Sequence, residues 1–404
     1  MFRVPSLPLD GLTVVEVSTY VAAPLGGMTL AQLGADVIRI DPLGGAPDTR
    51  RWPLARDSGT SLYWAGLNKG KRSMTVNLRS GEGQRLVAEL LERNGPHGGI
   101  LLTNAPGRSW LGYDTLRRVR PDLIHVQIQG RQDGTPAVDY TVNAEAGFPL
   151  VTGPDGHDQP VNHVVPIWDI ACGLYAALAV VSAVHQRGRT GDGQHVTIAL
   201  EDVALATAGN LGFLAEAQVN GVERHRIGNH LYGSFGRDFT CRDGARVMVV
   251  ALTGRHFADL VAVTGQQEPV AALEKALHRD FSLESDRYEF REVLAGLFGH
   301  WFARHDAATV HDALRQTSVL WAPYRSFAEL VAPDGPLSHH PLLSIVDQDG
   351  IGPHLSPASP IHTAQRAAAR PAPALGEHTV EVLRNELMMD DDAIAALRTA
   401  GVLE

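Results

Sequence analysis

Cysteine is scarce in this sequence: Cys172 and Cys241 are the only two among 404 residues. They are far apart and form no CxxC pair, which argues against a disulfide framework and against a zinc–thiolate site. Histidine is more frequent, with 18 residues, yet none stands in an HExxH pattern, and the adjacent His339 and His340 lie in the turn-like segment LSHHPLL. We therefore expect no metal site.

Long apolar runs and clusters of like charge are lacking as well. Residues 1–18 have neither the basic segment nor the apolar run of a signal peptide, and no later run approaches the length that crosses a bilayer. The 35 basic and 45 acidic residues give a net charge of -10 without long runs of either sign. This balance argues against nucleic acid or an anionic membrane as the main partner, and we expect a cytoplasmic protein.

Signatures of several common reactions are also missing. The sequence has no GxGxxG dinucleotide loop, no Walker phosphate loop and no GxSxG nucleophile elbow. It also has no pair of carboxylates that the pattern alone places across one cleft. A reaction must therefore be inferred from single residues or from the resemblance of longer segments.

Strand and helix patterns alternate through the first half of the chain. A strand at residues 13–17, a helix at 24–33 and a strand at 36–41 form a βαβ unit. Further strand patterns follow at 99–104, 123–130 and 193–200. This alternation predicts a Rossmann-like, doubly wound α/β domain with a mostly parallel sheet.

The pattern of apolar and polar residues changes near Gly221, which indicates a second domain. A hairpin pattern follows, and amphipathic helices dominate residues 255–330. We expect a large α/β domain made of residues 1–224 and 331–404, with two closing helices packed back on it. Residues 225–330 are expected to form a smaller α+β domain.

One carboxylate stands in an almost wholly apolar segment, VVPIWDIACGLYAAL at residues 164–178. Asp169 directly precedes a helical pattern, so its carboxylate can cap that helix and face the positive end of the helix dipole. The local sequence favours this cap. A carboxylate stripped of water by apolar neighbours is also a suitable nucleophile, and Asp169 is the best candidate in the chain.

Two weaker features concern ligand binding. Lys69, Lys71 and Arg72 form a positive patch on an acidic chain, which can hold a phosphate-bearing ligand, although the local sequence favours a solvated loop. Asn104 and Gln129 stand near the carboxyl ends of two strands, where doubly wound sheets place their ligands. Each of these polar residues is weak support by itself.

Several segments, taken together and in order, resemble the class III coenzyme A transferases. They are LDGLTVVEVSTYVAAPLGGMTLAQLGADVIRIDPLGG, NKGKRSMTVNLRSGEGQRLVAELL, DYTVNAEAGFPLVTGPDG, the run from VVPIWD to TIALEDV, and PALGEHTVEVL. The resemblance spans nearly the whole chain. It implies that Asp169 is the nucleophile, forming an aspartyl-CoA thioester, and that CoA is part of the substrate while no cofactor stays permanently bound.

The resemblance also implies CoA contacts at matching positions. These are Thr19, Tyr20, Val21 and Ala22 after the first strand, Asn68, Lys71 and Arg72 in the basic segment, Asn104 at a strand end, and Arg108. Two departures, Pro42 in place of an Arg and Val21 in place of a Gln, argue against a formyl or oxalyl substrate. Val138 stands where the racemase branch has a catalytic His, so one of its two bases is missing.

Within the family, the segments VDYTVN, VNHVVPIWDI and GNHLYGSFGRDF resemble the branch that moves CoA between the C1 and C4 carboxyls of mesaconate. This implies an intramolecular transfer, whose free carboxylate needs a cationic or N–H partner. The candidates are Arg51, Arg131, His230 and Arg237. An intermolecular transferase acting on two small carboxylic acids and a non-catalytic acyl-CoA binding protein are the alternatives. The family also implies an interlocked homodimer.

Overall fold

The structure is a computed structural model that describes residues 7–93, 95, 97–105, 109–362 and 366–404. Its chain divides into two compact units. The first comprises Met1–Ala146, His163–Ala215 and His339–Glu404, and the second comprises Gly147–Asn162 and Glu216–Ser338. The sequence predicted one domain of residues 1–224 with 331–404 and another of residues 225–330. These domain bounds stay a prediction. The units differ from them chiefly by placing 147–162 in the second unit.

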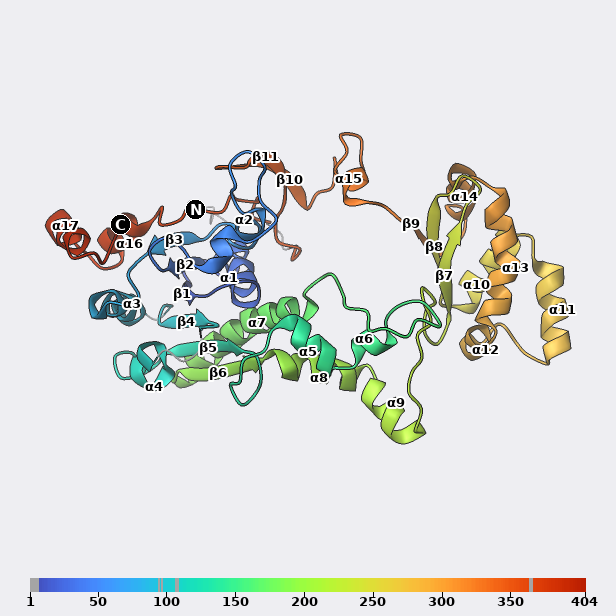
Figure 1. Ribbon diagram of the computed structural model, residues 1–404, viewed down its shortest axis with the longest axis horizontal. Helices are drawn as coiled ribbons and strands as arrows, with labels where there is room; N and C mark the ends of the chain where they lie inside the picture. Colours follow the sequence, from blue (N-terminus) through green and yellow to red (C-terminus); the bar gives the residue numbers. More distant parts are fainter. Residues whose placement is uncertain (1–6, 94, 96, 106–108, 363–365) are drawn as a thin grey trace, which may run out of the picture. The chain divides into compact units, whose positions relative to one another are not determined.

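A six-stranded sheet forms the centre of the first unit (Figure 1). Its strands are β1 (Thr13–Val17), β2 (Asp36–Asp41), β3 (Arg72–Thr75), β4 (Ile100–Thr103), β5 (Ile124–Gln129) and β6 (Gln194–Ala199). Their order is β3-β2-β1-β4-β5-β6, and all neighbours pair in parallel. The expected parallel α/β sheet is therefore confirmed. The strand order reverses between β1 and β4, and ligands of such sheets bind outside the carboxyl ends of the strands at this point.

Helices surround the sheet in the first unit. They are α1 (Ala22–Gln32), α2 (Leu62–Leu67), α3 (Gly81–Arg93), α4 (Tyr113–Leu116), α5 (Asp139–Glu145), α7 (Ile167–Thr190), α8 (Leu200–Asn210), α16 (Thr379–Asn385) and α17 (Asp391–Thr399), with the short 3-10 turns Pro47–Arg50 and Ser109–Leu111. A hairpin of β10 (Leu343–Gln348) and β11 (Gly352–Pro357) also belongs to this unit.

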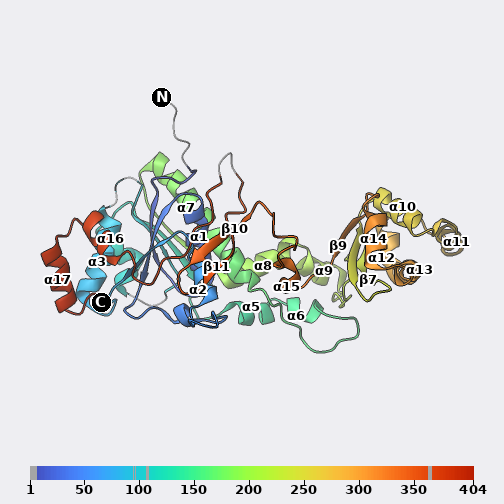
Figure 2. The same cartoon turned by 90° about the horizontal axis from the view of Figure 1, so that it is seen from above.

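The closing helices complete the core on one side of the sheet. Figures 1 and 2 show α16 and α17 beside α3. Val382, Leu383 and Ile394 pack in one buried cluster with the strand residues Val15 and Ile38. Both closing helices thus bury apolar residues in the core of the first unit, in line with the expectation that they pack back on the first domain.

Helices α1 and α7 pack very closely. A Cβ built on Gly26 would lie 2.9 Å from the carbonyl oxygen of Gly173, and one on Gly173 would lie 2.6 Å from that of Ala22. Only glycine leaves room for backbones at this separation. This contact fixes α7, and with it Asp169 in its first turn, against the helix that follows β1.

We expected no run long enough to cross a bilayer. Judged by length and composition only, α7 contradicts this expectation. Its 24 residues are apolar enough for a membrane span. One such helix is weak support for a span, because core helices pass the same test. In this structure α7 buries Cys172, Ala176 and Val180 within the first unit, while Leu174 and Leu178 on another face are exposed.

The second unit combines a small antiparallel sheet with helices. Strands β7 (Phe235–Thr240), β8 (Arg246–Ala251) and β9 (Leu320–Pro323) pair in that order. Its helices are α6 (Phe148–Val151), α10 (Gly254–Val263), α11 (Gln267–Leu277), α12 (Glu284–Glu289), α13 (Arg291–Arg304), α14 (Ala307–Leu314) and α15 (Phe327–Leu330), and α9 (Phe213–Asn220) leads into it. Phe235, Phe257 and Phe298 form its buried aromatic centre. The expected α+β character is confirmed.

Candidate active site

Asp169 lies in the first turn of α7, but it does not cap the helix. The helix begins at Ile167, its cap residue is Pro166, and no side chain of that residue makes a cap hydrogen bond. Instead, Oδ2 of Asp139 accepts hydrogen bonds from the backbone nitrogens of Trp168 and Asp169, at 2.8 and 3.2 Å. The cap interpretation of Asp169 is therefore wrong, because a carboxylate from α5 already occupies the helix terminus.

Asp139 is itself buried and is held in this position by His163. Nε2 of His163 lies 2.7 Å from its Oδ1 atom, and Asp139 is only 2% exposed. The indole nitrogen of Trp168 donates to Oδ1 of Asn143 at 3.2 Å, which ties α5 to α7 a second time. These contacts join two helices that are distant in the sequence. Asp139 directly follows Val138, which stands in the position of the racemase histidine, and the sequence alone predicted no role for His163.

The environment of Asp169 disfavours its charged form. Burial, and then the negative charge of Asp139, raise the pKa of the Asp169 carboxyl to about 7, while the positive charge of Arg51 acts in the opposite direction. A carboxyl whose pKa lies near neutrality and which is mostly shielded from water is a frequent feature of catalytic sites. Burial beside a second carboxylate raises a carboxyl pKa in the same way at sites without catalytic function, so the pKa alone does not identify a catalytic residue.

Arg51 is the cation that acts on Asp169. Its guanidinium lies over the rings of Tyr20 and Tyr63, 5.5 and 5.0 Å from their centroids. Burial raises the pKa of the Tyr63 hydroxyl, and so does the charge of Asp169, against the opposing effect of Arg51. Arg51, Tyr63 and Asp169 therefore belong to one electrostatic cluster, in which Tyr140 also takes part.

The other expected carboxylate partners make ion pairs of their own. Arg131 pairs with Glu145 at 2.6 Å on the surface. His230 and Arg237 belong to the second unit, where both pair with Glu292. Of the two candidates in the first unit, Arg51 and Arg131, Arg51 is the one whose charge acts on Asp169.

The loop after β1 and the end of β4 meet at the point where the strand order reverses. Oδ1 of Asn104 accepts from the backbone nitrogen of Thr19 at 2.9 Å, and its Nδ2 donates to the Thr19 carbonyl at 2.8 Å. Tyr20 follows with a φ of 65°, a backbone conformation that is costly for a non-glycine residue. Its amide donates to Oδ2 of Asp48 at 3.1 Å, and its ring is 45% exposed. Asn104 thus shapes this loop.

Five expected CoA contacts are brought together here: Thr19, Tyr20, Val21, Ala22 and Asn104. Val21 is the cap residue of α1 and Ala22 is its first residue, directly after Tyr20. Val21 and Ala22 are buried. Arg108 lies outside the described residues. Whether these residues contact CoA stays a prediction.

Two of the expected phosphate contacts are instead part of a buried network. The Nζ atom of Lys71 donates to Oε1 of Glu16, to the Pro24 carbonyl and to Oδ1 of Asn68, at 2.9, 2.9 and 2.8 Å. Arg39 donates to the same Asn68 oxygen at 3.0 Å. Burial lowers the pKa of Lys71 to about 8, against the raising effect of the Glu16 charge. The three donors of Lys71 are satisfied, so neither it nor Asn68 presents a free group to a ligand.

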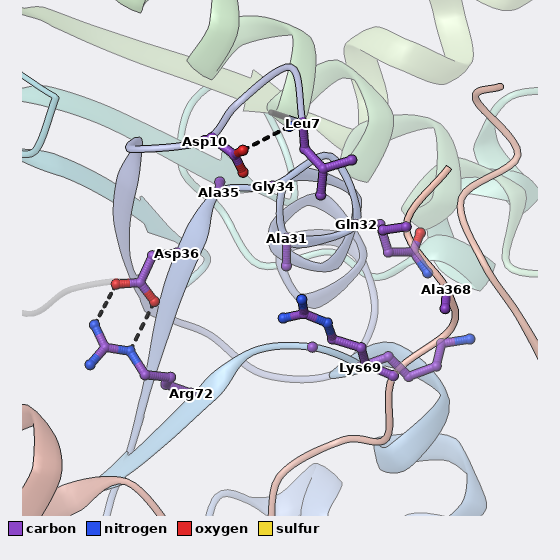
Figure 3. A pocket seen from close by; sticks show the side chains of 13 residues that line it. Leu7, Asp10, Ala31, Gln32, Gly34, Ala35, Asp36, Lys69, Arg72 and Ala368 are labelled. Carbon is purple, nitrogen blue, oxygen red and sulfur yellow. Dashed lines mark hydrogen bonds and ion pairs between the residues drawn. The ribbon is translucent and has the colours of Figure 1, made fainter. Parts of the chain in front are cut away.

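Arg72 is neutralised at the amino end of the edge strand β3. Figure 3 shows its guanidinium directed at Asp36 in the wall of a pocket of about 340 Å³. The distance from Nε to Oδ1 of Asp36 is 2.9 Å, and Glu381 and Glu386 pair with the same side chain. Asp36 and Arg72 begin β2 and β3, so this pocket adjoins the amino ends of these strands. The expected positive patch is thus largely paired with acids.

A metal is not part of this arrangement as far as the described residues show. No group of three or more His, Cys, Asp or Glu side chains among them is placed to hold an ion. Cys172 and Cys241 are free and buried, and burial raises the pKa of the Cys172 thiol to about 12, which suppresses the reactive thiolate. Within the described site, Asp169 is therefore the best-placed nucleophile.

Comparisons with known proteins identify the family of the chain. A family model described as CoA-transferase family III matches residues 9–379. The 2-methylfumaryl-CoA isomerase of Chloroflexus aurantiacus is 47% identical over 398 residues, which cover 98% of this chain and 97% of that protein. The succinyl-CoA–D-citramalate CoA-transferase of the same organism is 28% identical, and the match covers 99% of both chains.

Solved structures share the fold. A CAIB/BAIF family protein from Brucella suis has a TM-score of 0.77 and 26% sequence identity, covering 95% of this chain and 100% of that one. The fold class expected from the sequence is confirmed by this likeness together with the family match.

Proposed function

The chain belongs to CoA-transferase family III, and on this premise we propose that it moves CoA between the C1 and C4 carboxyls of mesaconate. The observation on which this rests is the Asp169 carboxyl, which is mostly shielded from water beside Arg51 and is relieved of helix capping by Asp139. The 47% identity to a 2-methylfumaryl-CoA isomerase supports the choice of substrate.

In the proposed reaction the Asp169 carboxylate attacks the C1 thioester carbonyl and expels CoA thiolate, leaving a mixed anhydride. The thiolate attacks the aspartyl carbonyl, which gives an aspartyl-CoA thioester and frees the C1 carboxylate. The C4 carboxylate then attacks this thioester and expels the thiolate again. Attack of the thiolate on C4 of the second anhydride yields the C4 ester and restores Asp169. Each difficult acyl transfer is split into easier steps, with no external acid consumed.

Arg51 supplies the positive charge that this sequence of steps needs. It favours the carboxylate form of Asp169. A guanidinium also binds a substrate carboxylate well, and the rings of Tyr20 and Tyr63 orient it in advance. We therefore propose that Arg51 binds the free carboxylate of the bound acyl group. This charge holds the released mesaconate near the aspartyl thioester, where proximity makes the second attack effectively unimolecular.

CoA is a substrate in this proposal and not a resident cofactor. The loop of Thr19, Tyr20, Val21 and Ala22, shaped by Asn104, is the proposed contact for its thioester end, because it follows β1 at the reversal of strand order. The buried network around Lys71 supports the sheet beneath this loop.

We also propose a homodimer located in the cytoplasm. Leu174, Tyr175, Leu178 and Val181 leave an apolar stripe of α7 between 38% and 59% exposed. Contiguous apolar surface of this kind is typical of an interface, and a second copy of the chain is the occupant that the family resemblance implies.

The decisive experiment supplies purified enzyme with mesaconyl-C1-CoA alone. The C4 ester should form without any added acid, and isotopically labelled free mesaconate in the medium should barely enter the product. Extensive incorporation, or a requirement for an added carboxylic acid, would identify an intermolecular transferase. With Asp169→Ala, turnover should be lost while CoA thioester binding stays within about tenfold, since a nucleophile contributes mainly to the transition state.

A mass spectrum of the quenched wild-type enzyme tests the covalent step. The peptide that contains Asp169 should carry the mass of CoA joined with loss of water. Turnover of Asp169→Ala near the wild-type level would refute the mechanism.

A further inference from the structure

The amino end of α7 binds a carboxylate from a distant part of the sequence. The free N–H groups of a helix terminus attract the nearest carboxylate, and the nearest in sequence is Asp169 itself. In the structure Asp139 takes this place, with its Oδ2 atom 2.8 Å from the nitrogen of Trp168 and 3.2 Å from that of Asp169. The side chain of Asp169 takes no part in this cap, and it lies close enough to Arg51 and Tyr63 for their charges to interact.

His163 fixes the orientation of Asp139. A carboxylate only accepts hydrogen bonds, so the Nε2 atom of His163 donates to Oδ1 across 2.7 Å. The imidazole is flanked by the rings of Tyr140 and Trp168, with centroids 5.7 and 6.1 Å away. With Oδ1 engaged by the imidazole, Oδ2 is directed at the helix terminus.

We infer that Asp139, oriented by His163, is a positioning residue that occupies the cap of α7 so that the Asp169 carboxylate remains available for attack. This inference rests on the proposed role of Asp169 as the nucleophile. It assigns the racemase-like segment around Asp139 a different task in this chain, where Val138 replaces the second base.

The negative charge of Asp139 also influences when Asp169 ionises. The groups that act on Asp169 are Asp139 from α5 and Arg51 from the loop before α2. Tyr63 of α2 and Cys172 of α7 are close as well, and Asp202 of α8 acts on Cys172. The pKa of Tyr63 is raised and that of Cys172 is about 12, so neither titrates near neutrality. Removing the charge of Asp139 therefore lowers the pH at which Asp169 becomes a carboxylate.

The first test is Asp139→Asn, which keeps a carbonyl oxygen for the two amides and removes the charge. The acid limb of kcat/KM reports the ionisation of the free enzyme. We expect this limb to move toward lower pH by about one unit, the usual effect of one neighbouring charge. Glu145→Gln is the matched control, because it makes the same change on the same helix at a residue that pairs with Arg131. Its acid limb should match the wild type.

The second test separates positioning from simple packing. His163→Leu removes the donor to Asp139 and should lower kcat at least several-fold with little change in KM, because the CoA contacts are untouched. His163→Gln retains an N–H donor and should recover most of the loss. If kcat of His163→Leu equals that of His163→Gln, the imidazole contributes only packing and the inference is wrong.

The outcomes distinguish this inference from the proposed function. If Asp169→Ala is inactive but Asp139→Asn leaves the acid limb unchanged, Asp169 is the nucleophile and the inference about Asp139 is wrong. If Asp169→Ala is active, the proposed function itself fails. Should Asp139→Asn not fold, the comparison of His163→Leu with His163→Gln decides the question alone.

Discussion

Oδ2 of Asp139 lies 3.2 Å from the backbone nitrogen of Asp169, so one carboxylate holds the helix that presents the other. The two charges oppose each other, and the Asp139 charge contributes to the raised pKa of Asp169. Such an arrangement costs stability and is retained where a reactive group is needed.

Asp169 should destabilise the folded protein as its proton is lost. Its folded pKa of about 7 lies above the unfolded value of about 3.9. Between these values the folded chain binds more protons than the unfolded chain, so stability falls as pH rises from about 4 to 7. Asp169→Asn removes this loss. Thermal unfolding should therefore give a higher Tm for Asp169→Asn at pH 8 than for the wild type, with a smaller difference at pH 5. Equal differences at both pH values would contradict the assignment.

Arg51 should matter for substrates that have a free carboxylate. Arg51→Met removes the cation and keeps an apolar stem over Tyr20 and Tyr63, so kcat/KM for mesaconyl-CoA should fall by a factor of about ten to one hundred, in line with about 1.5–3 kcal/mol for a charged hydrogen bond. Arg51→Lys should recover part of the loss. Steady-state kinetics measure both, and Arg131→Met serves as the control, because Arg131 pairs with Glu145. A loss of equal size in the control would place the free carboxylate elsewhere.

Lys71 should contribute to stability and hardly at all to CoA affinity. Lys71→Met removes the nearest cation of the buried Glu16 and leaves it with Arg39 at 3.8 Å and the Ser18 hydroxyl, which costs up to about 3–5 kcal/mol. The double variant Glu16→Gln with Lys71→Met should recover much of this loss, because both charges are then absent. Urea unfolding gives these free energies, and CoA thioester binding to the folded variants should stay near the wild-type value. If Lys71→Met instead raises KM for the CoA thioester and leaves stability unchanged, Lys71 contacts a phosphate of CoA, as the sequence suggested.

The exposed stripe of α7 should hold two copies of the chain together. Leu178 is 59% exposed in the single chain, and a charge at its position would be buried without a partner in an interface. Leu178→Glu should therefore give a monomer in sedimentation experiments, whereas the wild type sediments as a dimer. Met388→Glu, at a residue that is 78% exposed after α16, is the control and should stay dimeric. If the Leu178→Glu protein is still a dimer, this face of α7 is not the dimer interface.

Much of the first unit was determined by the sequence itself. The apolar runs at 13–17, 36–41 and 123–130 are too short for helices and rich in β-branched residues, so they predicted buried parallel strands, and the structure has β1, β2 and β5 there. Asp169 was also recognisable, because an isolated carboxylate in an apolar segment is rare enough to require an explanation.

The role of each charged group was decided only by the tertiary structure. Lys71 and Arg72 have the same local sequence whether they are solvated, bound to phosphate or paired with acids, and their partners Glu16, Asp36 and Glu386 are between 36 and 314 positions away. The same holds for Asp139, whose partner helix begins 28 residues later. Local propensity depends on a few neighbouring residues, whereas charges are neutralised by whichever groups the fold brings within a few ångströms. The sequence therefore indicated a candidate nucleophile, and the packing of α5 against α7 determined which carboxylate takes the helix terminus beside it.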